Sequence, residues 1–276
     1  MKSKWLILLG CISLMIYSKA RSQKPRLFPE HIPITDCTIR NWHLTQPTDS
    51  IDWFTDTLCS HADFEFLYVE TPHIALKMLM DSTLDRAFYE YYLTLFEDEM
   101  DPKWNSWLDT FLIQPHYHSR EMYVTGAQYW LKHNYIDMSL GMYDMSENTE
   151  ILTIAVGLDA YTGGAHAFQS SQIFNFDIAH SRILHLEDCF PPEHLPLIDK
   201  IAQLEWLQND PDSIFALSDY DFFLSPHFIF DENGLHLMYN AYEIGPYVMG
   251  APEIIIPMEI CRPLLHPTSW IARVYK

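Results

Sequence analysis

Strand-like and helix-like segments occur in separate blocks, and this separation constrains the fold more than any other feature. Between residues 120 and 186, apolar side chains alternate with polar ones or form short β-branched and aromatic runs, as in strands. Before this block, His73–Glu99 repeats apolar residues at spacings of three and four, and after it Glu193–Leu207 is predicted to be helical. Such blocks predict an α+β fold with mostly antiparallel sheets and packed helices. The other predicted elements are a helix, Lys103–Ile113, and the strands Ile34–Leu44, Asp63–Glu70, Glu121–Thr125, Tyr129–Met145, Ile151–Leu158, Gln172–Ile178 and Ile183–Leu186.

The pair Asn233-Gly234 predicts a β-hairpin near the end of the chain. It lies between His227–Phe230 and Leu235–Tyr239, which both carry alternating apolar residues. The acidic residues before the glycine do not fit a calcium loop, because the ligand alternation and the bidentate glutamate are missing. A last strand is predicted over Glu253–Pro257, followed by a short helical turn.

Two adjacent glycines, Gly163 and Gly164, mark the connection between two predicted strands. Glycine adopts positive φ and permits close backbone approach at low cost. Tyr161 and His166 flank the pair with one ring each, which suits a fixed and partly exposed turn. Two interpretations remain open: a ligand-binding turn, and a tight connection whose rings pack on the neighbouring sheet.

Residues 1–22 have the pattern of a signal peptide, with a positively charged start, an apolar core and a small polar end. The apolar core, residues 5–17, is shorter than the ~20 apolar residues of a membrane span. Ala20 and Ser22 satisfy the small-x-small rule, so we expect cleavage after Ser22, with cleavage after Ala20 as the close alternative. A further alternative is a lipoprotein acylated on Cys11. We therefore expect a periplasmic or extracellular protein.

The chain is strongly acidic. It has 17 Lys and Arg against 37 Asp and Glu, a net charge of −20. Four of the basic residues and no acidic residue lie in the predicted signal peptide, so the mature part would carry 13 basic against 37 acidic residues, or −24. Such a charge repels nucleic-acid phosphates and anionic membrane surfaces and favours cationic partners. Nucleic-acid binding is excluded on this ground.

Four cysteines follow the predicted signal peptide, and an oxidising compartment would permit disulfides between them. Cys189 and Cys261 lie in apolar surroundings, where a thiol serves as a small hydrophobic side chain. A bridge between Cys37 and Cys59 remains open.

No motif for a catalytic, metal or cofactor site is evident. His116 and His118 would share one face of a strand, but the sequence places no third ligand beside them. The motifs HExxH and GxSxG and a phosphate-loop lysine are absent. Acidic pairs such as Glu187-Asp188 have little specificity in a chain with 37 acids. We predict no catalytic residue, no metal and no cofactor.

A series of motifs follows in fixed order through the second half of the chain. They are Tyr161–His166, Phe174–Asp177, Leu186–Phe190, Asp231–Leu235, Tyr242–Tyr247, Gly250 and Ile254–Pro257. This series resembles the exported domain of RsiV, the anti-sigma factor that senses lysozyme, and the related domain of PdaC-type peptidoglycan deacetylases. The resemblance is best over about residues 150–262, and it implies a two-part α+β fold and, from RsiV, binding of a strongly cationic protein. We see neither a sigma-binding segment nor a deacetylase domain, so those activities do not carry over.

The sequence therefore predicts an exported, non-enzymatic binding module of the bacterial cell envelope. We expect a signal peptide at 1–22, an N-terminal PdaC-like domain at 23–186 and a C-terminal RsiV-type domain at 187–276. The expected partner is a cationic protein such as lysozyme, or a cell-wall glycan, and no membrane span is expected after cleavage. The alternative is a cell-wall-active enzyme or an accessory domain that contacts peptidoglycan. The candidate ligand-binding residues are Tyr161, Gly163, Gly164, His166, Tyr242 and Tyr247.

Overall fold

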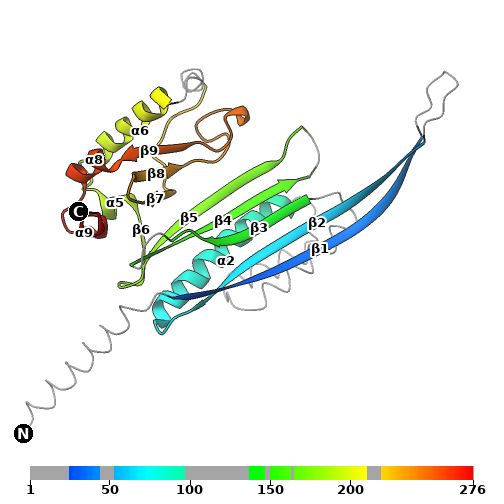
Figure 1. The fold of residues 1–276 in the computed structure, drawn as a ribbon, viewed down its shortest axis with the longest axis horizontal. Helices are drawn as coiled ribbons and strands as arrows, with labels where there is room; N and C mark the ends of the chain where they lie inside the picture. Colours follow the sequence, from blue (N-terminus) through cyan, green and yellow to red (C-terminus); the bar gives the residue numbers. More distant parts are fainter. Residues whose placement is uncertain are drawn as a thin grey trace, which may run out of the picture.

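Two β-sheets with helices packed against them make up the described part of the chain (Figure 1). The computed structural model describes residues 25–43, 53–96, 137–146, 150–162, 165–209 and 219–275, and along 33–43 and 53–59 it describes the backbone alone. The first sheet has the order β1-β2-β3-β4-β5-β6, and the second has the order β7-β8-β9. The strands are β1 Arg26–His43, β2 Trp53–Glu70, β3 Asp137–Asp144, β4 Ile151–Tyr161, β5 Phe168–Asp177, β6 Arg182–Leu184, β7 Phe228–Phe230, β8 Gly234–Met238 and β9 Glu253–Pro257. The helices are α2 Ile74–Phe96, α5 Leu186–Cys189, α6 Leu195–Asn209, α8 Met258–Cys261 and α9 Trp270–Val274, with 3-10 turns η2 Tyr247–Met249 and η3 Arg262–Leu264.

The predicted α+β class with mostly antiparallel sheets is confirmed. Among neighbouring strands, β2 and β3 are parallel and the other pairs are antiparallel. The helix predicted over His73–Glu99 is present as α2, and β9 begins and ends where predicted. The predicted signal peptide, the predicted helix Lys103–Ile113 and the predicted strand Glu121–Thr125 lie outside the described residues. The domain division at residue 186 stays a prediction.

β1 and β2 are longer than predicted and form a two-stranded arm. The sequence pattern predicts strands at Ile34–Leu44 and Asp63–Glu70, but each strand has 18 residues. The ladder between β1 and β2 continues through polar residues. Backbone N–H and C=O groups of the two strands pair with each other whatever their side chains, so the pairing does not require alternating apolar residues. β2 pairs with β3 over His61–Glu65, and the end of the ribbon where β1 stops and β2 starts projects beyond the sheet (Figure 1). In this ribbon the register places Cys37 opposite Cys59.

The first hydrophobic core lies between α2 and one face of the six-stranded sheet. Leu76, Met80, Leu84 and Phe88 recur at intervals of four on α2, and all four side chains are buried. The ring of Phe88 lies 4.7 Å from that of Phe66 on β2, measured between centroids. Each such side chain contributes roughly 1.5–3 kcal/mol by burial, so this helix is fixed by packing on the sheet.

The second core lies among α6, the three-stranded sheet and the C-terminal helices. It contains Ile198 and Trp206 of α6 and the apolar faces of β8 and β9. Cys189 and Cys261 are free and fully buried in it, which confirms their predicted role as small hydrophobic residues. Burial raises the pKa of the Cys189 thiol far above its ordinary value and raises that of Cys261 to about 12, so both stay protonated.

The predicted hairpin is present as β7 and β8, joined by Asp231–Gly234. Asp231 Oδ1 accepts hydrogen bonds from the backbone N–H groups of Asn233 at 2.7 Å and Gly234 at 3.0 Å, as in an Asx turn. Gly234 has φ of 151°, and a Cβ atom there would lie 2.0 Å from the carbonyl oxygen of Ile256 on β9. Glycine is therefore required by the close approach of two strands.

Polar contacts join the start of the three-stranded sheet, at His227 and Phe228, to the outer edge of β5. β6 covers this edge only from residue 175 to 177, so the earlier part of β5 has backbone groups free for other partners. Asn175 Nδ2 donates to the carbonyl oxygen of Phe228 at 2.8 Å, and Ile173 N–H donates to His227 Nδ1 at 3.2 Å. Burial lowers the pKa of His227, so its ring is neutral and Nδ1 is able to accept this bond.

Candidate binding site

Three of the six predicted ligand-binding residues meet in one cluster, which we call the aromatic cluster: His166, Tyr242 and Tyr247. His166 belongs to the connection between β4 and β5, and the two tyrosines lie between β8 and β9. The rings of His166 and Tyr247 stack at 3.7 Å between centroids and 17° between planes. The Tyr242 hydroxyl lies 3.1 Å from His166 Nε2, and the two tyrosine rings are 5.8 Å apart. The fold thus joins two motifs that are 76 residues apart.

Tyr242 has a strained backbone and a side chain that is 50% exposed. Its φ is +72°, a conformation that costs an L-residue roughly 1–2 kcal/mol. The surrounding turn is braced by Glu243, whose two carboxylate oxygens accept hydrogen bonds from the backbone N–H of Asn240 at 2.7 Å and from its side-chain amide at 3.1 Å. A bulky aromatic residue in such a position points to a role that packing alone does not explain.

The other predicted site residues lie in or next to the same connection as His166. Tyr161 is the last residue of β4, is half-buried, and pairs with Asp137 in the ladder to β3. Gly163 and Gly164 lie outside the described residues, so their part in a binding turn stays a prediction.

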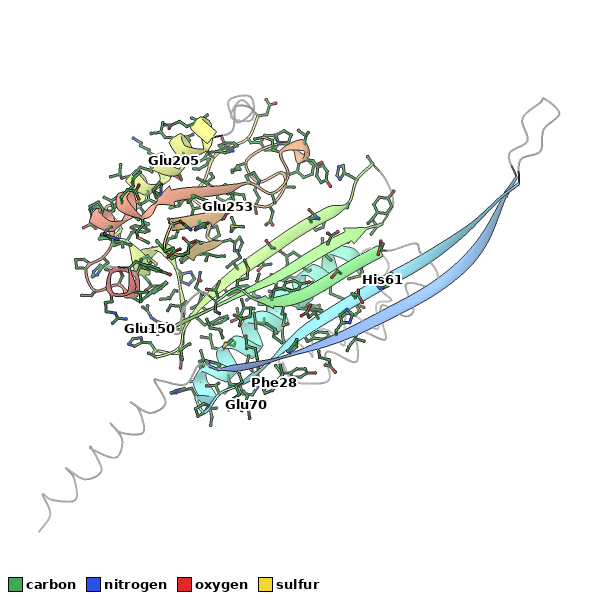
Figure 2. The ribbon with its side chains drawn as sticks, in the orientation of Figure 1. Phe28, His61, Glu70, Glu150, Glu205 and Glu253 are labelled. Carbon is green, nitrogen blue, oxygen red and sulfur yellow. The ribbon has the colours of Figure 1, made fainter. Side chains whose placement is uncertain are left out.

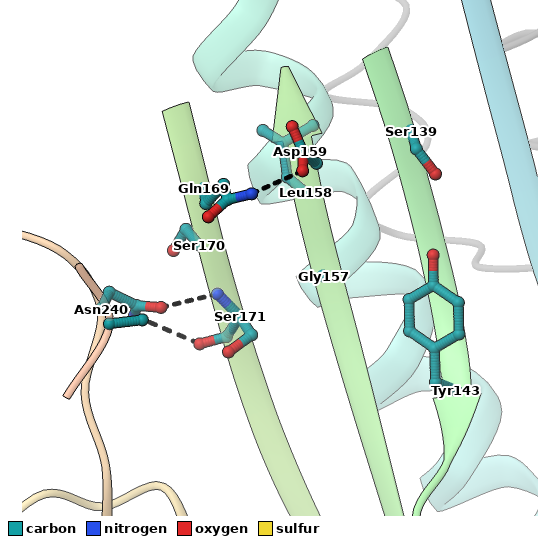
Figure 3. A pocket seen from close by; sticks show the side chains of 10 residues that line it. Ser139, Tyr143, Gly157, Leu158, Asp159, Gln169, Ser170, Ser171 and Asn240 are labelled. Atoms are coloured by element: carbon teal, nitrogen blue, oxygen red, sulfur yellow. Dashed lines mark hydrogen bonds between the residues drawn. The ribbon is translucent and has the colours of Figure 1, made fainter. Parts of the chain in front are cut away.

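A pocket of about 230 Å³ lies on the face of the six-stranded sheet opposite α2 (Figure 3). The strand register builds it from rows of residues that face each other across β3, β4 and β5. One row is small, with Gly141 opposite Gly157 and Gly157 opposite Ser171. The lining residues are Ser139, Tyr143, Gly157, Leu158, Asp159, Gln169, Ser170, Ser171, Asn240 and Ala251.

The ring of Tyr143 lies flat over the glycine row. A Cβ atom at Gly141 would lie 2.3 Å from the Tyr143 hydroxyl oxygen and 2.5 Å from Cζ, so only glycine leaves room for the ring. A Cβ atom at Gly157 would make ordinary contact, 3.6 Å from the same ring. Tyr143 therefore forms a flat aromatic surface, 38% exposed, beside the pocket floor.

The next row of the sheet is polar, with Ser139 opposite Asp159 and Asp159 opposite Gln169. Gln169 Nε2 donates a hydrogen bond of 2.6 Å to Asp159 Oδ2, which fixes both side chains. At the other wall, the Asn240 amide accepts from the backbone N–H of Ser171 at 2.7 Å and donates to its carbonyl oxygen at 3.2 Å (Figure 3). No motif in the sequence predicts this pocket. Small and polar residues alternating with buried apolar ones along β3 and β4 were its only signal.

A second group of titratable side chains lies on the three-stranded sheet, where His236 of β8 bridges two carboxylates. His236 Nε2 is 2.9 Å from Asp231 Oδ1, and His236 Nδ1 is 2.7 Å from Glu253 Oε1. Glu253 is the first residue of β9 and is labelled in Figure 2. Burial alone would lower the pKa of His236, but the hydrogen bonds to Glu253 and Asp231 outweigh burial and raise it. Within the described ranges, no group of His, Cys, Asp and Glu has an arrangement that would hold a metal ion.

Comparison with known proteins gives a family match for part of the chain and structural matches for its fold. Residues 187–259 match the DUF3298 family, which is described as a protein of unknown function. No curated protein matches the chain significantly. Among the residues described by the structure, no helix is both long and apolar enough to cross a membrane.

Two solved structures of DUF3298 family proteins are similar over nearly the whole chain. One, from Bacteroides fragilis, is 22% identical with a TM-score of 0.52 and covers 88% of this chain and 95% of its own. The other, from Pseudomonas aeruginosa, is 17% identical with a TM-score of 0.52 and covers 90% of this chain and 97% of its own. At these identities the similarity establishes a shared fold, and the fold carries no activity with it.

Proposed function

We propose that this chain is an exported, non-enzymatic binding module that recognises a cationic protein, such as lysozyme, on the surface formed by the aromatic cluster. The observation that carries the proposal is Tyr242, a half-exposed ring that a strained and braced turn holds against His166 and Tyr247. Strain retained at an exposed aromatic residue is characteristic of recognition sites. Tyrosine is also among the residues that dominate the energy of protein interfaces.

Charge and aromatic rings would act together in this recognition. The net charge of −20, or −24 without the predicted signal peptide, would attract a basic partner and raise its association rate. Charge alone gives weak and unselective binding. The rings supply selectivity because Lys and Arg side chains bind favourably over the faces of tyrosine rings.

The resemblance to RsiV supports a cationic protein as the partner, and the match of residues 187–259 to DUF3298 is compatible with it. The motif Tyr242–Tyr247, which carries this resemblance, contributes two of the three rings of the aromatic cluster. The export signal predicted at residues 1–22 would place the module where lysozyme acts.

Calorimetric titration with lysozyme, at low and at high salt, tests the proposal. The protein without residues 1–22 is compared with His166→Ala, Tyr242→Ala and Tyr247→Ala. Leu204→Ala serves as the control, because Leu204 is an exposed apolar residue of α6 outside the aromatic cluster. We expect at least one cluster variant to lose about 1–2 kcal/mol of binding free energy, as an interface anchor does, and the control to bind like the native protein. Binding should weaken as salt rises.

Two results would contradict the proposal. If the native protein does not bind lysozyme even at low salt, the partner is wrong. If it binds and all three cluster variants bind equally well, charge accounts for the whole interaction and the aromatic cluster is only a packed turn. Export is tested separately by the intact mass of the secreted protein, which should begin at Gln23. A diacylglycerol adduct on Cys11 would replace that prediction with a lipoprotein.

A further inference from the structure

The pocket beside Tyr143 has the chemistry of a site for an uncharged ligand rich in hydroxyl groups. None of its lining residues is Lys, Arg or His, so it offers no positive charge to an anion. Its one carboxylate, Asp159, already accepts a hydrogen bond from the Gln169 amide, so this carboxylate does not by itself indicate a cation site. The hydroxyls of Ser139, Tyr143 and Ser171 both donate and accept hydrogen bonds, as sugar hydroxyls do.

The Tyr143 ring provides an apolar surface next to these polar groups. Because Gly141 has no side chain, the ring lies against the backbone of the sheet. The ring lines the pocket and is partly exposed. A pyranose ring has a flat face of C–H groups and a rim of hydroxyls, so it matches an aromatic face flanked by fixed carboxylate and amide groups.

The size of the pocket also fits one sugar ring. Its volume is about 230 Å³. This is below the ~300–1,000 Å³ typical of sites for drug-sized ligands. One side of the pocket is open, so a longer chain of sugars would continue outside it.

We propose that this pocket binds one ring of a neutral carbohydrate, which stacks on Tyr143 and hydrogen-bonds to Asp159 and Gln169. The site lies beside the aromatic cluster and is distinct from it, since none of His166, Tyr242 and Tyr247 lines the pocket. The proposal does not depend on recognition of a cationic protein, and the two ligands are tested separately.

Calorimetric or NMR titration tests this site with three oligosaccharides: the trimer of N-acetylglucosamine, cellotriose and the anionic trimer of mannuronate. We expect at least one neutral trimer to bind and the mannuronate trimer to bind at least about tenfold more weakly, because the pocket holds a carboxylate and no cation. Asp159→Asn and Tyr143→Ala should each weaken the neutral trimer at least about tenfold, as expected for loss of a charged hydrogen bond or an anchoring ring.

Gly157→Ala provides a variant that keeps the fold. The added methyl group makes only ordinary contacts, 3.6 Å from Tyr143 and 3.8 Å from the Ser170 carbonyl oxygen, but it fills the pocket floor. It should weaken the sugar about as much as Tyr143→Ala does. Tyr242→Ala is the matched control and should bind the sugar like the native protein.

The inference is overturned if neither neutral trimer binds at millimolar concentration, or if Gly157→Ala and Tyr143→Ala, both folded, bind the sugar as the native protein does. Tighter binding of the mannuronate trimer would also overturn it. Lysozyme titration of the same variants separates the two proposals, since Tyr143→Ala should leave lysozyme binding unchanged and Tyr242→Ala should reduce it.

Discussion

Replacing Tyr242 by glycine should give a more stable protein than replacing it by alanine. Both substitutions remove the ring and its contacts with His166 and Tyr247, so their difference isolates the backbone. At most positions alanine is the more stable of the two, because glycine has more conformational freedom to lose on folding. At Tyr242 the φ of +72° reverses the order.

The expected difference follows from two opposing terms. An L-residue pays roughly 1–2 kcal/mol for a left-handed backbone, and glycine does not. Glycine loses about 0.4–1 kcal/mol more than alanine through the entropy of the unfolded chain. The glycine variant should therefore be more stable than the alanine variant by about 0.5–1 kcal/mol, which corresponds to roughly 1–4 °C in the melting temperature of a chain of this size.

Thermal and urea unfolding of both variants measure the difference. The same pair of substitutions at Tyr247, which has no positive φ, is the control and should show the ordinary order with alanine more stable. If alanine is also the more stable residue at position 242, the backbone there is not strained, and the structural argument for a recognition role fails. Both variants should lose lysozyme binding alike, since the ring is absent from each.

Three further predictions concern other parts of the fold. Gly234→Ala should destabilise the protein by at least about 2 kcal/mol in urea unfolding, because the new Cβ atom meets the backbone of β9. Cys37 and Cys59 are paired in the ladder register, where Cα atoms lie about 4.5–5.5 Å apart, so export to an oxidising compartment, as proposed above, should give a disulfide between them, detected as two thiols that resist alkylation without reductant. The raised pKa of His236 implies stability that is fully present below the unfolded value of about 6.5 and is lost as pH rises through the folded value. The lowered pKa of His227 acts in the opposite direction and is shared by native protein and variant, so the test is a comparison: on going from pH 8 to pH 6, the unfolding midpoint of the native protein should rise relative to that of His236→Gln.

The sequence predicted the elements that have a strong local signal. The spacing of Leu76, Met80, Leu84 and Phe88 defined α2, since one helical face must be apolar to pack on a sheet. The pair Asn233-Gly234 predicted the hairpin because Asn-Gly favours a tight turn between two strands. The sequence also indicated the three residues of the aromatic cluster as candidates, but no pattern in it predicted that they would be in contact.

The pocket depends on register, which no local pattern determines. Gly141, Gly157 and Ser171 lie on three strands, and each is unremarkable within its own segment. They form the pocket floor only because the register of the three strands brings them side by side. The Tyr143 ring lies flat beside this floor only because Gly141 has no side chain in its place. Backbone hydrogen bonds between strands establish that alignment, and they act over distances that sequence periodicity does not report.

Asn240 connects the two proposed surfaces. Its amide bridges the backbone N–H and carbonyl of Ser171 at the pocket wall, while its own backbone N–H is held by the Glu243 carboxylate that braces the turn of Tyr242. Asn240→Ala would leave the Ser171 N–H without this partner, at a cost of about 1–3 kcal/mol, and would free both the wall and the turn. It should therefore weaken carbohydrate and lysozyme together, whereas Tyr143→Ala and Tyr242→Ala should each weaken one ligand. If Asn240→Ala unfolds normally yet leaves both affinities unchanged, the two surfaces do not depend on this junction, and the sites are positioned by the sheets alone.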